Sequence, residues 1–377
     1  MTLDRSLQVD FRHRVRFTED VFAPDNATLA SVCSDGIPRR MIAFIDTGVH
    51  QAQPDIGERL ANYLGARAKI GEPVPELKMI EVVSGGEEAK NSNDVYEQVL
   101  VAIDRYGIDR KSFVLAIGGG AVLDAVGLGA TLAHRGVRLI RMPTTTLAMD
   151  DAAMGVKNGI NKFGKKNFCG TFSVPWAVIA DEEFLITLTD QQFLSGFSEA
   201  IKIGCLKDPT LFELIEQSAA RIVARDLAAA MPIIKRSAEL HLDHITQGGD
   251  AFELNEARPL DFGHWAAHKL ESMSTYEIAH GDAVAIGIAL DCEYAVRMKI
   301  LSQKDSTRII ACLQALRLPI WHPMLLQTDQ LLRGLEEFRE HLGGRMNITL
   351  LRAIGESTEV HQIDSGVVAA SAKALAP

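Results

Sequence analysis

The sequence predicts a two-part protein with an α/β first half, built on a parallel sheet, and an all-helical second half. Short β-branched apolar runs alternate with amphipathic helical patterns in the first half. From residue 191 onward, long helical periodicities dominate. Strand, helix and strand in this rhythm indicate βαβ units, which require a parallel sheet. We expect the boundary near 181–189, with an α/β domain over 1–183 and a helical domain over 184–377.

The individual elements of the first half follow from these patterns. Apolar runs predict strands at 41–46, 78–83, 113–117 and 137–141, and helical periodicity predicts helices at 55–68, 87–106 and 121–134. In the second half, helices are expected to break at Asp208-Pro209, Gly248-Gly249 and Leu318-Pro319. Proline and glycine interrupt helices because one lacks an amide donor and the other loses more entropy on ordering.

Composition and charge exclude several classes of function. The chain of 377 residues has a formal net charge of −10, which argues against a nucleic-acid or anionic-membrane surface. No apolar run approaches the ~18 residues that a membrane span needs. The N-terminus is charged throughout, and the five cysteines are scattered, as in a reduced protein. We therefore expect a cytoplasmic protein with a small-molecule partner.

A glycine run marks a candidate nucleotide site. Gly118, Gly119 and Gly120 follow a predicted strand and precede a predicted helix. Glycine lets the backbone approach a pyrophosphate, and a helix N-terminus offers amide donors. Asp46, at the end of an earlier strand, could accept from ribose hydroxyls. A tight turn without a ligand remains an alternative for both features.

A second segment carries cations between glycines. Lys157, Lys166 and Asn167 are expected in glycine-bounded turns rather than on a solvated helix face. Cations in such turns suit a phosphoryl group or a negatively charged intermediate. A solvated loop is the alternative interpretation.

Histidines and a glutamate suggest a metal site. His264 and His268 are four residues apart on a predicted helix and share a face, and His280 opens the next apolar run. Imidazoles are preferred ligands of zinc. Glu199 lies one helical turn from Lys202 and could complete a His/His/Glu site. Core histidines and an ordinary helical ion pair are the alternatives.

Seven ordered motifs connect these pieces over about residues 40–360: GGGxxxD, PTTxLAxxD, GxKxGxN, KNxxGxF, GxxEAIKxG, GHxxxHxxE and HGxAVAxG. Together they resemble the 3-dehydroquinate synthase family, the sugar phosphate cyclases. The resemblance implies a Rossmann-like NAD-binding α/β domain, an all-α C-terminal domain, an active site between them and a homodimer. It also implies NAD and Zn²⁺ or Co²⁺ as cofactors and a sugar phosphate as substrate.

The resemblance assigns roles to residues. It makes Glu199, His264 and His280 the metal ligands and moves His268 to the phosphate of the substrate. Arg135 matches an arginine that reaches across the dimer to that phosphate. Residues that would face substrate are Asp151, Lys157, Lys202 and Arg258. Residues that would contact NAD are Asp46, Glu87, Lys90, Gly119, Gly120, Asp124, Thr144, Thr145, Lys166 and Asn167.

The implied chemistry needs no separate strong nucleophile. An alcohol of the substrate is oxidised transiently by NAD, phosphate leaves by β-elimination, and the hydride then returns. Ring opening and an intramolecular aldol reaction close a carbocycle. One pocket suffices because the substrate carries much of the reactivity.

Departures from dehydroquinate synthase bear on the substrate. Asp261 replaces an asparagine, His241 replaces a substrate-facing lysine, and Arg258 stands one residue nearer His264 than the family arginine does. A C-terminal Lys-Lys pair is replaced within FREHLGG, at Arg339-Glu340. These changes remove positive charge where a substrate carboxylate would bind, and an aspartate accepts well from hydroxyls.

We therefore expect a polyol end on the substrate, as in sedoheptulose 7-phosphate. The DFGH and FREHLGG segments also resemble the sedoheptulose 7-phosphate cyclases. The retained His268, where 2-epi-5-epi-valiolone synthases tend to carry proline, resembles the 2-epi-valiolone synthase branch.

Other functions stay open on the sequence. They are a 3-dehydroquinate synthase with a reshaped pocket, a 2-epi-5-epi-valiolone synthase, and a metal-dependent polyol dehydrogenase such as glycerol dehydrogenase. The dehydrogenase would release NADH and would not need Lys157, Lys166 or Arg135 for phosphate. A catalytically silent homologue is disfavoured because Glu199 and His264 are retained.

Overall fold

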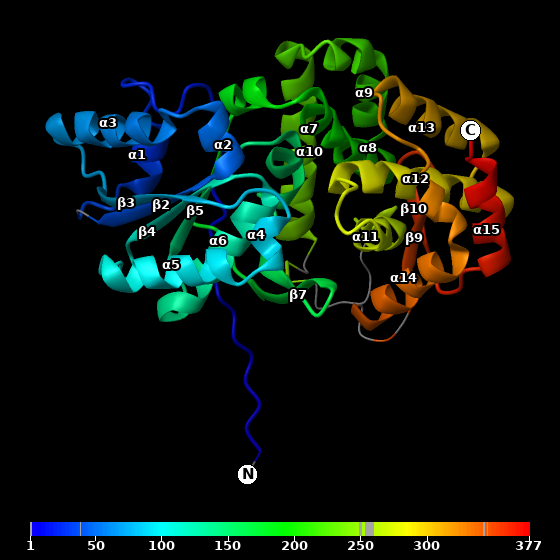
Figure 1. The fold of residues 1–377 in the computed structure, drawn as a ribbon, viewed down its shortest axis with the longest axis horizontal. Helices are drawn as coiled ribbons and strands as arrows, with labels where there is room; N and C mark the ends of the chain where they lie inside the picture. The colour runs from blue at the N-terminus through cyan, green and yellow to red at the C-terminus, as the bar shows by residue number, and fades with distance from the viewer. Residues whose placement is uncertain (1, 38, 249–250, 253–259, 342–343, 345) are drawn as a thin grey trace.

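The computed structural model describes residues 2–37, 39–248, 251–252, 260–341, 344 and 346–377 (Figure 1). Its first half contains a six-stranded sheet in the order β1-β8-β5-β4-β2-β3, and every neighbouring pair is parallel. The expected parallel sheet is confirmed, and β1 and β8 extend it beyond the four expected strands. The bounds are β1 (Val15–Thr18), β2 (Arg40–Asp46), β3 (Glu76–Val83), β4 (Phe113–Gly118), β5 (Arg138–Pro143) and β8 (Ala177–Asp181).

Helices cover both faces of this sheet, with α1 and α3 on one face and α5 and α6 on the other (Figure 1). Along β2, Met41 and Ile45 pack into one apolar cluster, whereas Ile42 and Phe44 pack into a second. A strand buried on both faces reads as a continuous apolar run. The covering helices are α1 (Thr28–Cys33), α2 (Thr47–Ala52), α3 (Ile56–Lys69), α4 (Glu88–Asn91), α5 (Asp94–Arg105) and α6 (Gly120–Leu132).

The single helix expected over 87–106 is wrong, because the structure has two helices there. Helix α4 ends at Asn91, and Ser92 has extended backbone with φ −121° and ψ 172°. The Ser92 Oγ accepts from the amide of Asp94 at 3.2 Å. Serine side chains that bond to nearby backbone compete with helical hydrogen bonds. The break leaves α4 as a short helix of four residues, Glu88–Asn91.

The glycine-bounded turns expected around Lys157 and Lys166 are also wrong. The chain there forms an antiparallel hairpin of β6 (Lys157–Lys162) and β7 (Lys165–Phe172). A Cβ on Gly159 would lie 2.7 Å from the carbonyl oxygen of Cys169 on the facing strand. Glycine therefore serves the close approach of two strands here, a role it often has within sheets.

From α7 onward the described chain is mostly helical, as expected. Asp208 caps α9 by accepting from the amides of Thr210 at 3.0 Å and Leu211 at 3.3 Å, and Pro209 begins the helix. Both features favour a helix start at the expected break. Helix α10 ends just before Gly248, while Gly249 lies outside the described residues. The bounds are α7 (Asp190–Ser195), α8 (Phe197–Lys207), α9 (Pro209–Val223), α10 (Leu227–Gln247), α11 (His264–Met273), α12 (His280–Arg297), α13 (Gln303–Ala315), α14 (Thr328–His341) and α15 (Ser365–Ala374).

One two-stranded element interrupts this helical half. Strands β9 (Ile348–Ala353) and β10 (Glu356–Val360) form an antiparallel hairpin, so the second half is not purely helical. Leu350 and Leu351 of β9 are fully buried in the apolar core that this half shares with one face of the sheet. No helix of the described chain is long and apolar enough to cross a membrane.

The two halves meet where loops after the strands reach the helices. Helix α11 packs against β7, and α10 packs against a π-helical turn, Ala148–Ala152, that follows β5. Met149 of that turn shares the apolar core with Phe193 and Phe197 of the helical half. This junction is where the candidate site residues lie.

Candidate active site

A cavity lies at the carboxyl edge of the sheet, beside the ends of β2 and β4. It has a volume of about 490 Å³ and is lined by Asp46, Gly119, Thr144 and Thr145 among others. Asp46 ends β2, and Gly119 caps the N-terminus of α6. Crevices at this edge of a parallel sheet, beside a helix N-terminus, are suited to dinucleotides. The cavity therefore brings together four of the residues expected to contact NAD.

The Asp46 carboxylate has a defined place in this cavity. Its Oδ1 accepts from the amide of Gly48 at 2.7 Å, and burial raises its pKa. A Cβ on Gly85 would lie 2.1 Å from Asp46 Oδ1, so only glycine leaves the carboxylate where it is. The carboxylate is thus held at the cavity wall, where a ribose could donate to it.

Other residues expected to contact NAD are paired with each other. Lys90 Nζ lies 2.7 Å from Asp124 Oδ2, and Lys90 is buried. The Asn161 side-chain amide donates to Glu87 Oε1 at 2.7 Å. Neither Lys90, Asp124 nor Glu87 is among the residues that line the cavity. These pairs link α4 and its N-cap residue to α6 and β6.

The remaining three residues expected to contact NAD are Gly120, Lys166 and Asn167, and each contacts other parts of the protein. A Cβ on Gly120 would lie 2.9 Å from Ala152 Cβ, so Gly120 serves the packing of α6 against the turn after β5. The amide of Asn167 donates to Asn161 Oδ1 at 2.9 Å. Lys166 pairs with Glu271 of α11 instead of lining the cavity.

Glu199, His264 and His280 converge at the junction from three different helices. Glu199 lies on α8, His264 begins α11 and His280 begins α12. Glu199 Oε1 lies 3.4 Å from His264 Nε2 and 3.6 Å from His280 Nε2. One donor atom from each residue lies within 4.8 Å of the others. Two imidazoles and a carboxylate are a common ligand set for a catalytic zinc ion.

The start of α11 depends on a glycine. Gly263 has φ +79°, and a Cβ there would lie 2.8 Å from the amide nitrogen of Ile288 on α12. The left-handed conformation favours glycine, and the missing side chain lets α11 begin directly against α12. His264 and His280 are thereby brought to the same end of two packed helices.

Charge balance keeps Glu199 ionised although it is fully buried. Burial opposes ionisation, but Lys202 and His264 together hold the pKa of Glu199 well below its usual range. Lys202, one turn along α8, forms an ion pair with Glu199. Burial also opposes the charge on Lys202, and Glu199 and Asp151 outweigh it, so the pKa of Lys202 is raised. The site thus holds a carboxylate ligand and an ammonium group side by side.

Asp151 and His241 form a second polar pair next to Lys202. Asp151 Oδ1 lies 3.1 Å from His241 Nδ1 and 4.0 Å from Lys202 Nζ. Burial and Glu199 oppose the charge on Asp151, but Lys202 and His241 outweigh them and lower its pKa. Asp261 acts on Lys202 as well, because its negative charge raises the pKa of that lysine. Carboxylates thus surround this ammonium group.

His268 lies against the two metal-ligand candidates. Its ring centroid is 5.5 Å from that of His264, and it stacks on His280 at 5.9 Å. Burial and the neighbouring Lys166 lower the pKa of His268 well below its usual range, so its ring is neutral at pH 7. His264 and His268 therefore lie on one helix face, as expected. The carboxylate of Glu199, however, lies beside His264 and His280, and these three residues are the metal-ligand candidates.

Three expected site residues are not brought to this cluster. Lys157 is exposed at the start of β6, and its carbonyl accepts from Arg141 at 2.6 Å. Arg135 is exposed in a turn with φ +60°. Arg258 lies outside the described residues.

Glu271 closes the motif GHxxxHxxE, but no role in the site was expected for it from the sequence. One of its oxygens pairs with Lys166, and the other lies 3.1 Å from His280 Nδ1. Its spacing of three from His268 and seven from His264 places it on the same helix face, which was the available signal. Asp150 is another buried carboxyl group for which the sequence indicated no role. It lies beside Asp151, and burial together with that neighbour raises the pKa of Asp150 well above its usual range.

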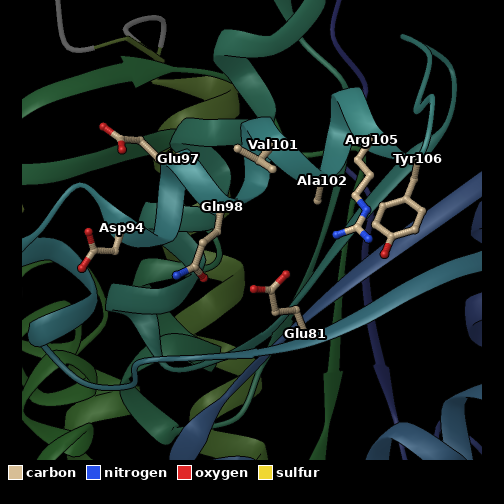
Figure 2. Close-up of a pocket in the computed structure, with 8 residues that line it drawn as sticks. All are labelled: Glu81, Asp94, Glu97, Gln98, Val101, Ala102, Arg105 and Tyr106. Carbon is tan, nitrogen blue, oxygen red and sulfur yellow. The ribbon is translucent and has the colours of Figure 1, made fainter.

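A groove of about 410 Å³ between edge strand β3 and helix α5 is a different kind of surface (Figure 2). Figure 2 shows the carboxylates of Glu81, Asp94 and Glu97 there, with Arg105 and Tyr106 at one end. It shares no lining residue with the nucleotide cavity or the metal-ligand candidates. The candidate site residues gathered at the junction of the two halves are thus separate from this groove.

Comparisons with known proteins identify the family of this chain. Residues 80–195 match the family model described as 3-dehydroquinate synthase N-terminal, and residues 196–339 match that described as 3-dehydroquinate synthase C-terminal. A 2-epi-5-epi-valiolone synthase of Actinomyces sp is 32% identical over 96% of this chain and 94% of the relative. A 3-dehydroquinate synthase of Xanthomonas campestris pv. campestris is 31% identical over 81% of this chain and 83% of the relative.

Solved structures share the fold. The 2-epi-5-epi-valiolone synthase from Streptomyces hygroscopicus subsp. jinggangensis 5008, with NAD⁺ and Zn²⁺ bound, superposes with a TM-score of 0.89 at 29% identity over 99% of both chains. A 2-deoxy-scyllo-inosose synthase complexed with carbaglucose-6-phosphate, NAD⁺ and Co²⁺ superposes with a TM-score of 0.77 at 22% identity over 96% of both chains. The expected fold class is confirmed, and the chain belongs to the 3-dehydroquinate synthase family, the family of the sugar phosphate cyclases.

Proposed function

We propose that this chain is a sugar phosphate cyclase that converts sedoheptulose 7-phosphate into a C7 cyclitol of the 2-epi-valiolone type. The observation that carries the substrate assignment is the charge around Lys202. The groups that raise the pKa of this lysine are the carboxylates of Glu199, Asp151 and Asp261. A substrate carboxylate would meet like charges there, whereas hydroxyl groups would find acceptors.

NAD⁺ and a divalent ion, Zn²⁺ or Co²⁺, fit the two parts of the site. The cavity beside Asp46 and Gly119 has the position and lining for a dinucleotide. Neither oxygen of Glu199 makes a well-formed hydrogen bond to any described residue, and two imidazole nitrogens lie beside it. When bound, the nicotinamide supplies a reversible hydride acceptor and the ion supplies a Lewis acid.

The side chains around these groups would orient the sugar and move protons. Lys202 donates to an oxygen of the substrate, and Asp151 accepts from a neighbouring hydroxyl. His241 exchanges a proton with Asp151, 3.1 Å away, so the pair can relay a proton without leaving an isolated charge. The neutral ring of His268 donates to the phosphate. Residues 1–183 would then form the nucleotide domain and 184–377 the metal domain.

Partner residues would complete the phosphate site. We propose a homodimer in which Arg135 of each subunit reaches the phosphate bound by the other. Its exposed position in a left-handed turn makes it available to a neighbouring molecule. Lys157 and Arg258 would supply further positive charge from within the subunit.

The stereochemistry of the cyclitol product distinguishes two possible activities. The curated relatives include several 2-epi-5-epi-valiolone synthases, which makes that product the alternative. We favour the 2-epi-valiolone type because His268 occupies the site next to His280 with an imidazole that can hold phosphate. Proton NMR of the isolated cyclitol distinguishes the two products.

One experiment tests the substrate class. Purified protein with NAD⁺ and Zn²⁺ or Co²⁺ is given sedoheptulose 7-phosphate or the seven-carbon acid substrate of dehydroquinate synthase. We expect phosphate release from the ketose phosphate with no net NADH. Phosphate release from the acid alone would show a dehydroquinate synthase instead. Accumulation of NADH would show a polyol dehydrogenase.

A further inference from the structure

We infer that Lys166 and Glu271 position His280 and thereby make metal affinity depend on how the β6–β7 hairpin sits against helix α11. This inference rests on the metal site of the proposed function. It concerns two residues that lie outside the three metal-ligand candidates and that come from different halves of the chain. Both act through His280, so they are positioning residues.

The geometry around Glu271 gives each of its oxygens one partner. Oε1 pairs with Lys166 Nζ, and Oε2 lies 3.1 Å from His280 Nδ1. A carboxylate can only accept, so Nδ1 must carry the proton of the imidazole. In the neutral ring the opposite nitrogen, Nε2, is then free of a proton and can bind a metal, and it is the atom that lies 3.6 Å from Glu199 Oε1. Carboxylate–histidine–metal arrangements of this kind fix both the tautomer and the orientation of the ligand.

Lys166 also bears on a second possible metal site. His268, Glu271 and His280 form a second group whose donor atoms lie within 4.8 Å of one another. That group shares His280 with the first one, so both cannot bind separate ions with the same nitrogen. Lys166 occupies Glu271 Oε1 with a positive charge that would repel a cation. Glu199 carries a similar ammonium neighbour, Lys202, so the Lys166 ion pair does not by itself select between the two groups. It leaves Oε2 of Glu271 as the partner of His280.

The pair is almost entirely buried, which makes it sensitive to its surroundings. The Glu271 side chain is 3% exposed and that of Lys166 12% exposed. Removing one partner of a buried ion pair leaves an uncompensated charge, which is costly. The hairpin must therefore be seated on α11 for Glu271 to remain paired while it holds His280.

The same hairpin is tied to the nucleotide side of the site. The Asn161 side-chain amide donates to Glu87 Oε1 at 2.7 Å and to Asn91 Oδ1 at 2.8 Å, and its Oδ1 accepts from the amide of Asn167. Gly86, adjacent to Glu87, lines the nucleotide cavity. A dinucleotide that orders this loop would also hold Lys166 in place. Coupling between two binding sites is reciprocal, so the metal should strengthen dinucleotide binding by the same factor.

The test measures binding of Co²⁺ by its visible absorption, in the full-length protein. We expect Lys166→Met to weaken Co²⁺ binding by about 10- to 100-fold, the usual effect of losing a partner of a metal ligand. Glu271→Gln should weaken it similarly, and Lys166→Arg should restore most of the affinity. Lys165→Met is the matched control, because Lys165 is the adjacent residue and pairs at 3.0 Å with Glu340 in an exposed position.

The double variant Lys166→Met/Glu271→Gln guards against loss of folding, because it removes both buried charges together. It should fold, as judged by circular dichroism, yet bind Co²⁺ as weakly as the single variants. Wild-type affinity in that folded double variant would overturn the inference. A wild-type protein that bound no Co²⁺ at all would instead refute the metal site of the proposed function.

A second measurement tests the coupling. The dissociation constant of NAD⁺ is measured by calorimetry with and without Zn²⁺, for the wild type and for Lys166→Met. We expect Zn²⁺ to tighten NAD⁺ binding at least 5-fold in the wild type and less than 2-fold in the variant. Equal effects of Zn²⁺ in both proteins would show that Lys166 carries no coupling.

Discussion

His241 Nδ1 lies 3.1 Å from Asp151 Oδ1, so a histidine is paired with a carboxylate at the edge of the candidate site. Lys202 Nζ lies 4.0 Å from the same Asp151 oxygen. The carboxylate of Asp151 balances the charge of Lys202, so this end of the site offers hydrogen-bonding groups but little net positive charge. A lysine at the same position would compete with Lys202 for Asp151 and would attract a carboxylate. This relationship underlies the first prediction.

The double variant His241→Lys/Asp261→Asn should shift preference toward the acid substrate. It adds one positive charge and removes one negative charge beside Lys202, and both changes favour a substrate carboxylate. We expect the ratio of kcat/KM for the acid to that for sedoheptulose 7-phosphate to rise at least 10-fold. Phosphate release with each substrate measures this ratio. A ratio that stays at the wild-type value would mean that these two residues do not face the variable end of the sugar.

His280→Ala should abolish metal binding, because it removes one of the three convergent donors. We expect bound Zn²⁺ to fall below one tenth of the wild-type content, with loss of cyclase activity. His361→Ala is the control, since His361 is exposed and its Nδ1 lies 3.1 Å from the carbonyl oxygen of Met346. Elemental analysis of dialysed protein gives the metal content. Full metal occupancy in the variant would remove His280 from the ligand set.

The contribution of Asp291 to the free energy of unfolding should fall as pH rises from about 4 to 7. Burial raises the pKa of Asp291 to about 7, where it accepts from the amide of Gly263 and from the Trp265 indole. The folded state then binds this proton more tightly than the unfolded state does, so stability is highest below pH 4 for this group and decreases up to pH 7. One group contributes at most about 1.4 kcal/mol per pH unit.

Asp291→Asn should flatten that slope, because asparagine does not ionise. Urea unfolding of both proteins at pH 5, 6, 7 and 8 measures the change. The comparison of slopes does not depend on how much the substitution costs at any single pH. Parallel pH profiles for the two proteins would mean that Asp291 does not titrate in this range.

Particular residues show how much of the fold and of the candidate site the sequence predicts. The continuous apolar run in 41–46 and the glycines after 113–117 predicted the strands that place Asp46 and Gly119, because local pattern indicates buried parallel strands. The motif order carried the resemblance and hence Glu199, His264 and His280. The role of Glu271 was missed because its partner Lys166 is 105 residues away, and no local period records such a contact.

The errors have physical reasons as well. Residues 157–172 were expected as turns because glycines usually punctuate loops, but here Gly159 and Gly170 permit two strands to pass closely. Strand β1 pairs with β8, more than 150 residues away in the chain, so its sheet partner was invisible in a local window. Lys157 and Arg135 remain predictions, because a single subunit leaves both at the surface.

Gly85→Ala should weaken NAD⁺ binding while leaving the metal site intact. The new Cβ would lie 2.1 Å from Asp46 Oδ1, so the carboxylate must leave its position at the cavity wall. Loss of a hydrogen bond to a charged group costs about 1.5–3 kcal/mol, which corresponds to a dissociation constant about 10- to 150-fold higher.

Gly65→Ala is the matched control, because nothing lies within 4 Å of a Cβ there and Gly65 is inside helix α3. The control should be about 0.5–1 kcal/mol more stable than the wild type and bind NAD⁺ normally. Calorimetry with NAD⁺ and Co²⁺ absorption measure the two sites separately. Unchanged NAD⁺ affinity in Gly85→Ala would show that Asp46 does not hold the dinucleotide, and equal loss of both ligands would show a general folding defect.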